Sequence, residues 1–202
     1  MLHGQSVLED NFEGYPEDFD LKLSWPTSAG NGITLSTEVN RIPVGGTKSV
    51  KIGRSDDRAT RDLGSAIPTG VTARFTVHIY NTNFVQNTRV QAGLTHTGST
   101  AELGIGWFNN ATAVIDGVAD AWNGTKYQGR VSGTGGNFYF NLNNPGTPDR
   151  RIGWQKFDIE RLPDGVTRFY VDDILGRTVT NLTSVSTSDL ITAVIGFGLG
   201  SV

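Results

Sequence analysis

The chain has 202 residues, a net charge of −3, a sequence pI of about 5.6 and no cysteine. It lacks the basic runs that bind a phosphate backbone and the ~18-residue apolar stretch of a membrane helix, so we expect neither nucleic acid nor a membrane span. Without cysteine there are no disulfides, zinc-thiolate sites or thiol nucleophiles. A chain of this length buries roughly 70% of its unfolded surface, so residues 1–202 can form one stable domain.

The composition favours many short strands joined by tight turns. Apolar residues make up 37% of the chain and 26 residues are glycine, which supplies the positive φ angles that turns need. We expect strands at Thr47–Ile52, Val71–Tyr80, Arg89–Thr95, Glu102–Phe108, Thr112–Val118, Lys126–Val131, Asn137–Leu142, Trp154–Arg161, Thr167–Asp172 and Val194–Leu199.

Two segments are less regular. The stretch from Asp56 to Ala66 carries mixed charges and reads as a loop or one short strand. The Ser/Thr-rich stretch from Asn181 to Leu190 reads as a connection with room for one helical turn. The strand-like C-terminal sequence leaves open a further strand beyond residue 202.

Alternation of apolar and polar residues identifies the expected core. The strand Val71–Tyr80 alternates with period two, and so do the two strands that flank the turn Pro163-Asp164-Gly165. The residues that we expect in the core are Val71, Phe75, Val77, Ile79, Phe157, Ile159, Phe169 and Val171.

Two stretches of sequence carry a resemblance to a known fold family. The segment Trp154-Gln155-Lys156-Phe157-Asp158-Ile159-Glu160, the Asp164-Gly165 turn and Arg168-Phe169-Tyr170-Val171-Asp172-Asp173 resemble a hairpin of concanavalin A-like and laminin-G-like jelly rolls. The segment from Asp10 to Pro16, Trp25 and the segment Gly46–Ile52 resemble the opening of such domains. The resemblance implies an all-β, two-sheet antiparallel jelly-roll sandwich. It also implies that a concave face or the loops at one edge often hold sugar, and that a structural calcium is common.

Carboxylate spacing argues against a polysaccharide-degrading enzyme. Glycoside hydrolysis needs two carboxylates in a cleft, and residues two apart on a strand share a face. Asp158 and Glu160 have that spacing, but we expect them on a solvated polar face. The Arg-Asp-Leu stretch at Arg61 lacks the Glu and second Arg of alginate-lyase-like jelly rolls.

The region between Gly106 and Gln128 is the densest mixture of aromatic and amide residues in the chain. Aromatic rings stack on sugar rings, and amides and carboxylates bond to hydroxyl groups. We therefore expect a glycan site that contains Trp107, Asp120, Trp122, Asn123 and Tyr127, with Trp122 and at least one of the other two rings partly exposed. The competing interpretation places the two tryptophans in the core.

Asp10 and Glu13 are the candidate metal ligands, because related jelly rolls fix their first strand with a metal and calcium prefers hard oxygen ligands. The competing interpretation is an exposed acidic edge.

Three functions stay open on the sequence. The favoured one is a non-catalytic, extracellular or surface module that binds a glycan or polysaccharide. The alternative is a structural, assembly or adhesive protein, such as a cell-surface layer, filament or virion decoration, whose sheet edges join copies into a larger assembly. The third is a hydrolase or lyase. The N-terminal sequence lacks the basic and apolar regions of a signal peptide, so an extracellular, cell-surface or virion-surface location is an expectation from function alone.

Overall fold

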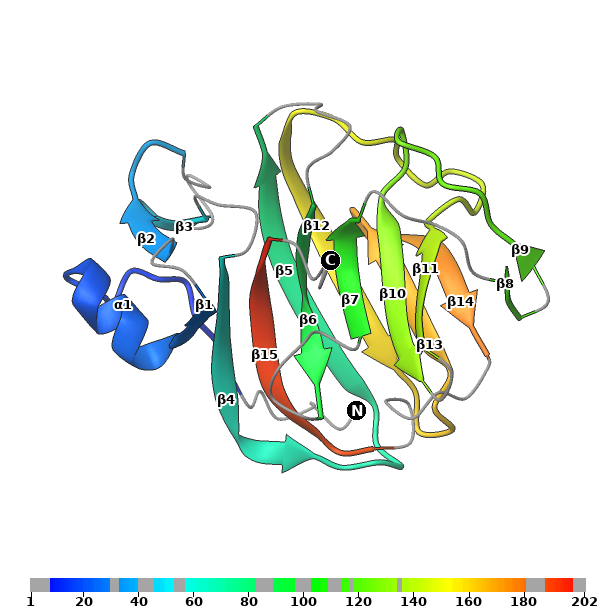
Figure 1. Cartoon of the computed structure of the whole chain (residues 1–202), viewed down its shortest axis with the longest axis horizontal. Helices are drawn as coiled ribbons and strands as arrows, with labels where there is room; N and C mark the ends of the chain where they lie inside the picture. Colours follow the sequence, from blue (N-terminus) through cyan, green and yellow to red (C-terminus); the bar gives the residue numbers. More distant parts are fainter. Residues whose placement is uncertain are drawn as a thin grey trace.

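The protein is a sandwich of antiparallel strands in the computed structural model, which describes residues 8–29, 33–39, 46–52, 57–82, 89–96, 103–108, 114–116, 118–133, 136–180 and 188–197 (Figure 1). Among these residues, no helix has the length and apolar character of a membrane span. The elements in chain order are α1 (Asp18–Ser24), β1 (Thr27–Ala29), β2 (Ile33–Ser36), β3 (Ser49–Ile52), β4 (Arg58–Ile67), β5 (Ala73–Asn81), β6 (Val90–Thr95), β7 (Leu103–Trp107), β8 (Val114–Ile115), β9 (Val118–Ala119), β10 (Gln128–Gly133), β11 (Gly136–Asn141), β12 (Gly153–Arg161), β13 (Thr167–Val171), β14 (Ile174–Val179) and β15 (Leu190–Phe197).

Two sheets form the two layers of the sandwich. The larger sheet has seven strands in the order β1-β4-β15-β6-β7-β10-β11, and the smaller has four in the order β14-β13-β12-β5. Because β15 lies between β4 and β6, the C-terminal strand joins segments from early and middle parts of the chain. Such returns across a sheet are typical of a jelly roll.

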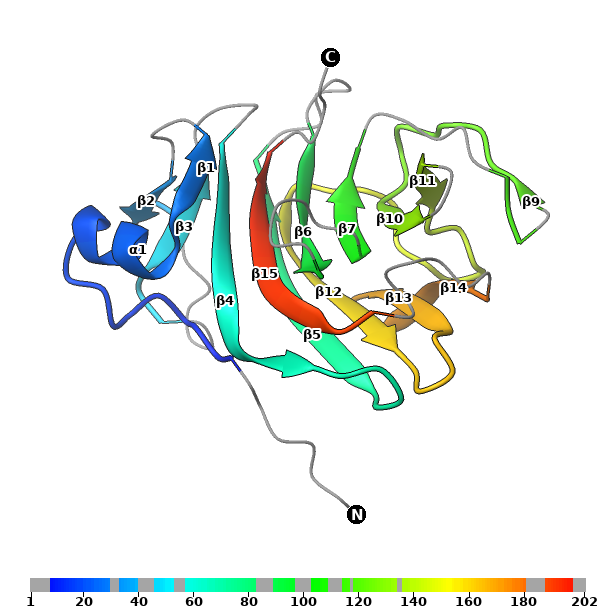
Figure 2. The same ribbon diagram turned by 60° about the horizontal axis from the view of Figure 1, so that its bottom comes forward.

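Small elements extend the sandwich at its two ends (Figures 1 and 2). The helix α1 and the β2-β3 hairpin lie beyond β1 and β4. The β8-β9 pair lies at the opposite end, near β11 and β14, and replaces the longer strand expected over Thr112–Val118. Residues 112, 113 and 117 of that expectation lie outside the described residues.

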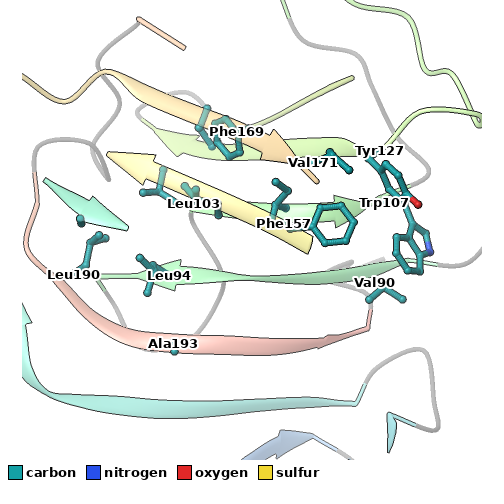
Figure 3. Packing of buried hydrophobic residues seen from close by; sticks show 14 of the residues in the cluster. Val90, Leu94, Leu103, Trp107, Tyr127, Phe157, Phe169, Val171, Leu190 and Ala193 are labelled. Atoms are coloured by element: carbon teal, nitrogen blue, oxygen red, sulfur yellow. The ribbon is translucent and has the colours of Figure 1, made fainter. Parts of the chain in front are cut away.

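The core lies between the two sheets and contains side chains that alternate inward along each strand (Figure 3). The expected core positions Phe157, Ile159, Phe169 and Val171 are each at most 1% exposed, which confirms the phase of β12 and β13. The rings of Phe140 and Phe169 meet edge to face across the sandwich, with centroids 5.1 Å apart.

One predicted core residue is wrong, and three are less buried than expected. Val71 is 43% exposed, because β5 begins two residues later and Val71 belongs to the preceding turn. Phe75, Val77 and Ile79 face the core but are partly buried, since β5 is the edge strand of the smaller sheet.

The structure describes one of the two less regular segments almost completely and only the end of the other. The mixed-charge stretch from Asp56 to Ala66 is mostly the ten-residue strand β4, because its small and apolar residues Ala59 and Leu63 face inward. In the expected Asn181–Leu190 connection, residues 181–187 lie outside the described residues, and Leu190 opens β15.

Candidate functional site

Trp122 lies exposed on the loop that leads from β9 to β10. The residue is 38% exposed, and its neighbour Asn123 is exposed as well. A large aromatic ring in water costs free energy, so an exposed tryptophan is a candidate contact for a ligand.

The backbone around Trp122 is held on both sides by hydrogen bonds. Asn141 at the end of β11 donates from Nδ2 to the carbonyl of Ala121 (2.8 Å). After the ring, Asn123 closes a turn: its side-chain oxygen accepts a bond from the backbone N–H of Thr125 (3.0 Å), and its carbonyl accepts one from Lys126 (3.1 Å). The exposed ring therefore sits on a fixed loop.

Asp120 ties the start of this loop to both sheets. Its carboxylate accepts hydrogen bonds from the backbone N–H and the side-chain amide of Asn141, each 2.7 Å long. It also forms an ion pair with Arg177 on β14 (3.2 Å), and both side chains are less than 10% exposed. Asp120 therefore has a structural role at the start of the loop, since both of its carboxylate oxygens bond to protein groups.

The loop is also fastened to the segment before β12. Arg150 donates from its backbone N–H to the carbonyl of Thr125 (2.7 Å) and from its side chain to the carbonyl of Gly124 (3.2 Å). Lys126 forms an ion pair with Asp149 (2.6 Å).

The other two aromatic residues of the predicted site are buried. Trp107 is 3% exposed and Tyr127 is 0% exposed, and their rings pack 6.2 Å apart inside the core. Tyr127 also contacts Phe157 edge to face (5.0 Å), and burial raises the pKa of its hydroxyl above the usual value. The expectation that one of these rings joins Trp122 at the surface is wrong, because both rings lie in the core between the sheets.

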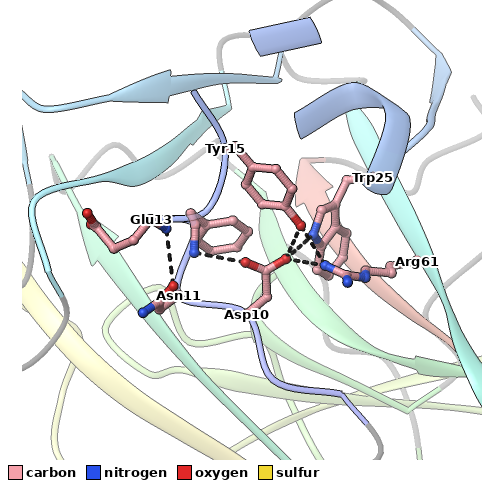
Figure 4. Close-up of polar contacts among 7 residues, drawn as sticks. Asp10, Asn11, Glu13, Tyr15, Trp25 and Arg61 are labelled. Carbon is pink, nitrogen blue, oxygen red and sulfur yellow. Dashed lines mark hydrogen bonds and ion pairs between the residues drawn. The ribbon is translucent and has the colours of Figure 1, made fainter. Parts of the chain in front are cut away.

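The candidate metal ligand Asp10 lies in a cluster of protein donors (Figure 4). Its carboxylate accepts bonds from the hydroxyl of Tyr15 (2.5 Å) and the indole N–H of Trp25 (2.8 Å), and it pairs with the guanidinium of Arg61. The other oxygen accepts the backbone N–H of Phe12 (2.8 Å).

Glu13, the second candidate ligand, fastens the segment that precedes β3. Its carboxylate accepts the backbone N–H groups of Thr47 and Lys48, each at 2.6 Å, and the hydroxyl of Thr47 at 3.0 Å. The bond from the Lys48 N–H is the main reason that the pKa of Glu13 lies below its usual value.

Asp10 and Glu13 do not fit a calcium site in this arrangement, because N–H and O–H donors and a guanidinium take the oxygen lone pairs that calcium needs. Within the described part of the chain, no three His, Asp or Glu side chains gather where they could hold a metal ion. The arrangement favours the competing interpretation, in which protein donors hold both carboxylates, and a melting experiment with calcium and chelator tests it.

The carboxylates of Asp158 and Glu160 share the outer face of the smaller sheet, but only one of them matches the expected solvated position. Asp158 is 0% exposed, because Arg74, Thr76 and Lys156 cover it. Glu160 is partly exposed and bonds to Tyr170 (3.1 Å) and Arg168 (3.4 Å).

The outer face of the seven-stranded sheet holds an amide row that the sequence reasoning missed. Gln91, Gln128 and Asn141 lie side by side across β6, β7, β10 and β11, with Gly106 between the two glutamines. All three amides are at most 3% exposed. The signal in the sequence was a polar residue at alternate positions of strands whose other positions face the core.

Phe108 contacts residues on this outer face of the seven-stranded sheet. Its backbone N–H donates to the side-chain oxygen of Gln128 (2.8 Å), and its ring contacts that of Tyr139 at 5.2 Å. The amide row is therefore covered in this structure, whereas Trp122 is accessible.

Comparisons with known proteins fix the fold. No family model and no curated protein matches the sequence. The globular domain of calreticulin from T. cruzi superposes on 89% of this chain and 80% of its own length, with a TM-score of 0.58 at 10% identity. This chain has the concanavalin A-like jelly-roll fold.

Two further jelly rolls are similar at lower scores. The carbohydrate recognition domain of Emp46p matches with a TM-score of 0.40 and 10% identity, over 97% of this chain and 92% of that one. β-Agarase B from Zobellia galactanivorans matches with a TM-score of 0.46 and 13% identity, over 95% and 77%. The fold assignment rests on the calreticulin domain, and at identities this low no likeness shows the function of this chain.

Proposed function

We propose that this jelly roll is a non-catalytic module that binds carbohydrate at the Trp122 loop, outside the cell or at a cell or virion surface. The observation that carries the proposal is a partly exposed tryptophan on a loop whose backbone is bonded before and after the ring. A ring held in place loses little entropy when a sugar stacks on it, so the site is prepared for binding.

The polar surroundings of the ring suit hydroxyl groups. Asn123 and Thr125 are exposed on the same loop. Asn143 is exposed two residues beyond the end of β11. Thr125 already bonds to the side-chain oxygen of Asn123, so the Asn123 amide can donate to a sugar hydroxyl and the Thr125 hydroxyl can accept from one. A few such contacts with one stacked ring support affinities in the micromolar to millimolar range.

The non-catalytic part of the proposal rests on how the carboxylates are used. A glycosidase needs an acid and a second carboxylate roughly 5–10 Å apart in a cleft. The carboxylate nearest to Trp122 in the loop, Asp120, is occupied by Asn141 and Arg177. Asp158 is buried on the outer face of the other sheet.

Affinity electrophoresis tests the proposal. The wild-type protein should be retarded in gels that contain a soluble neutral polysaccharide, and Trp122→Ala should run as it does in a gel without polysaccharide. Phe19→Ala is the matched control, because Phe19 is an exposed ring at the other end of the molecule. Equal retardation of wild type and Trp122→Ala, or release of reducing ends by the wild type, would reject the proposal.

A second candidate function, assembly through protein contacts, is favoured by one observation. Phe19 and Leu23 lie four residues apart on α1 and are each 67% exposed, so they form an apolar pair on one helix face. Light scattering after size-exclusion chromatography would support assembly if the wild type forms oligomers that Phe19→Ser with Leu23→Ser does not form.

A further inference from the structure

The Trp122 loop belongs to a larger edge of the molecule formed by three segments, residues 120–126, 142–152 and 172–177. Asn144 donates its backbone N–H to the carbonyl of Gly176 (3.0 Å), which joins the second segment to the third. The second segment is joined to the loop by the bonds of Arg150 described above. We call these three segments the Trp122 edge.

Charge is balanced within the Trp122 edge. It contains four acidic and four basic side chains: Asp120, Asp149, Asp172, Asp173, Lys126, Arg150, Arg151 and Arg177. The formal charges of the three segments therefore sum to zero, and Asp173 is in addition paired with Lys156 of β12 (2.5 Å).

Each basic side chain of the Trp122 edge has a partner within it. Lys126 pairs with Asp149 (2.6 Å), Arg151 with Asp172 (2.6 Å), and Arg177 with Asp120 (3.2 Å).

The fourth basic residue, Arg150, is withdrawn from the surface. It is 6% exposed, its guanidinium lies over the ring of Trp107 at 5.2 Å, and it donates to the carbonyl of Gly124. An anionic ligand at this edge would consequently meet carboxylates already paired with the local cations.

We propose that the Trp122 edge takes uncharged oligosaccharides and discriminates against uronate and sulfate groups. This inference rests on the proposed glycan-binding function. An acidic sugar must lose hydration when it docks, and here it would have to displace a carboxylate to gain a cation. A neutral sugar needs only the ring of Trp122 and the uncharged groups of Asn123, Thr125 and Asn143, which remain exposed.

The test compares two classes of polysaccharide at one ionic strength, because surface charge effects depend on salt. The neutral probes are mixed-linkage β-glucan, xylan and arabinan, and the acidic probes are polygalacturonate and alginate. In affinity electrophoresis the wild type should bind at least one neutral probe about tenfold more tightly than either acidic probe, a difference of about 1.4 kcal/mol.

The variant Asp149→Asn tests whether binding of the acidic probes can be increased. It leaves Lys126 without its carboxylate, so retardation by the acidic probes should increase while retardation by the neutral probes stays the same. Glu38→Gln is the matched control, because it releases Lys51 in the same way at the opposite end of the molecule and should leave both unchanged.

The outcomes separate this inference from the proposed function. Wild-type binding that is as strong for polygalacturonate or alginate as for the neutral probes, lost in Trp122→Ala, would overturn the selectivity and keep the site. An acidic-probe affinity that Asp149→Asn leaves unchanged would also overturn it. Retardation by none of the five probes, or retardation that survives Trp122→Ala, would reject the proposed site itself.

Discussion

Glu13 joins the N-terminal segment to the chain before β3 through a single carboxylate. Hydrogen bonds from the backbone of Lys48 and Thr47 favour its charged form and lower its pKa in the folded protein. A depressed pKa contributes stability at pH values above the unfolded pKa of about 4.3, and that stability is lost as the pH falls through the folded pKa.

We therefore expect the wild type to lose more stability than Glu13→Gln when the pH falls from neutral to about 3. Urea unfolding at both pH values measures the difference. Glu9→Gln, a neighbouring exposed residue, is the control and should follow the wild type. Parallel losses in wild type and Glu13→Gln would show that the Glu13 contacts do not carry the acid sensitivity.

At the level of strands, β10 and β11 fit together because Gly129 has no side chain. Phe140 lies opposite Gly129 in the pairing, and a Cβ at Gly129 would come within 2.6 Å of Cζ in that ring. Phe140 is fully buried and packs against Phe169 of the other sheet, so its ring has no room to retreat.

Gly129→Ala should thus lower the free energy of unfolding by about 1–3 kcal/mol. Chemical denaturation of Gly129→Ala, Phe140→Leu and the double variant measures the coupling, and the double variant should be more stable than the sum of the two losses implies. Gly14→Ala, where nothing lies within 4 Å of the new methyl group, should change stability by less than about 0.5 kcal/mol. A harmless Gly129→Ala would mean that the ring does not pack on this glycine.

Core positions within the four-stranded sheet differ in how much they contribute to stability, because β13 is a central strand and β5 an edge strand. Phe169 is fully buried in a central strand, whereas Phe75 is partly buried in the edge strand β5. Phe169→Ala should cost about 3–5 kcal/mol, and Phe75→Ala distinctly less, because less surface and fewer contacts are lost. Equal losses in denaturant unfolding would contradict the edge position of β5.

Local pattern predicted the central elements of the fold well. Apolar residues alternate at Phe157 and Ile159 and at Phe169 and Val171, on either side of Pro163-Asp164-Gly165, so both the turn and the buried face could be read from the sequence. The helix α1 could not be, because it has seven residues and only Leu21 is buried, which is too little for a helical period. The strand β14 was missed because Asp172 and Asp173 adopt positive φ in a tight turn that favours Asn or Gly.

The candidate site was predictable only in part, because composition does not reveal side-chain direction. Trp107, Trp122 and Tyr127 have similar polar neighbours in sequence, yet only Trp122 is exposed. Trp107 faces inward beside Val90, and Tyr127 directly precedes β10 with its ring in the core. The ion pair between Asp120 and Arg177 joins residues 57 positions apart in the sequence, and no short-range pattern predicts such a contact.

For the whole molecule, we propose that the protein donors around Asp10 and Glu13 fasten the N-terminal segment in place of a structural metal. Arg61, Tyr15 and Trp25 join the N-terminal segment to β4 and α1 through Asp10. We expect the melting temperature to be the same in millimolar calcium and in excess chelator, since a ligand that binds only the folded state would raise it. A rise with calcium that Asp10→Asn abolishes would show that these carboxylates exchange their protein donors for the ion.

We propose that one exposed ring, Trp122, on a fixed loop makes this jelly roll a carbohydrate-binding module. A glycan array probed with the wild type and with Trp122→Ala tests it most directly, after circular dichroism and melting confirm that both are folded. We expect wild-type binding to a subset of neutral glycans and no binding above background for Trp122→Ala. Binding of both proteins to the same glycans, or of neither to any, would contradict the claim.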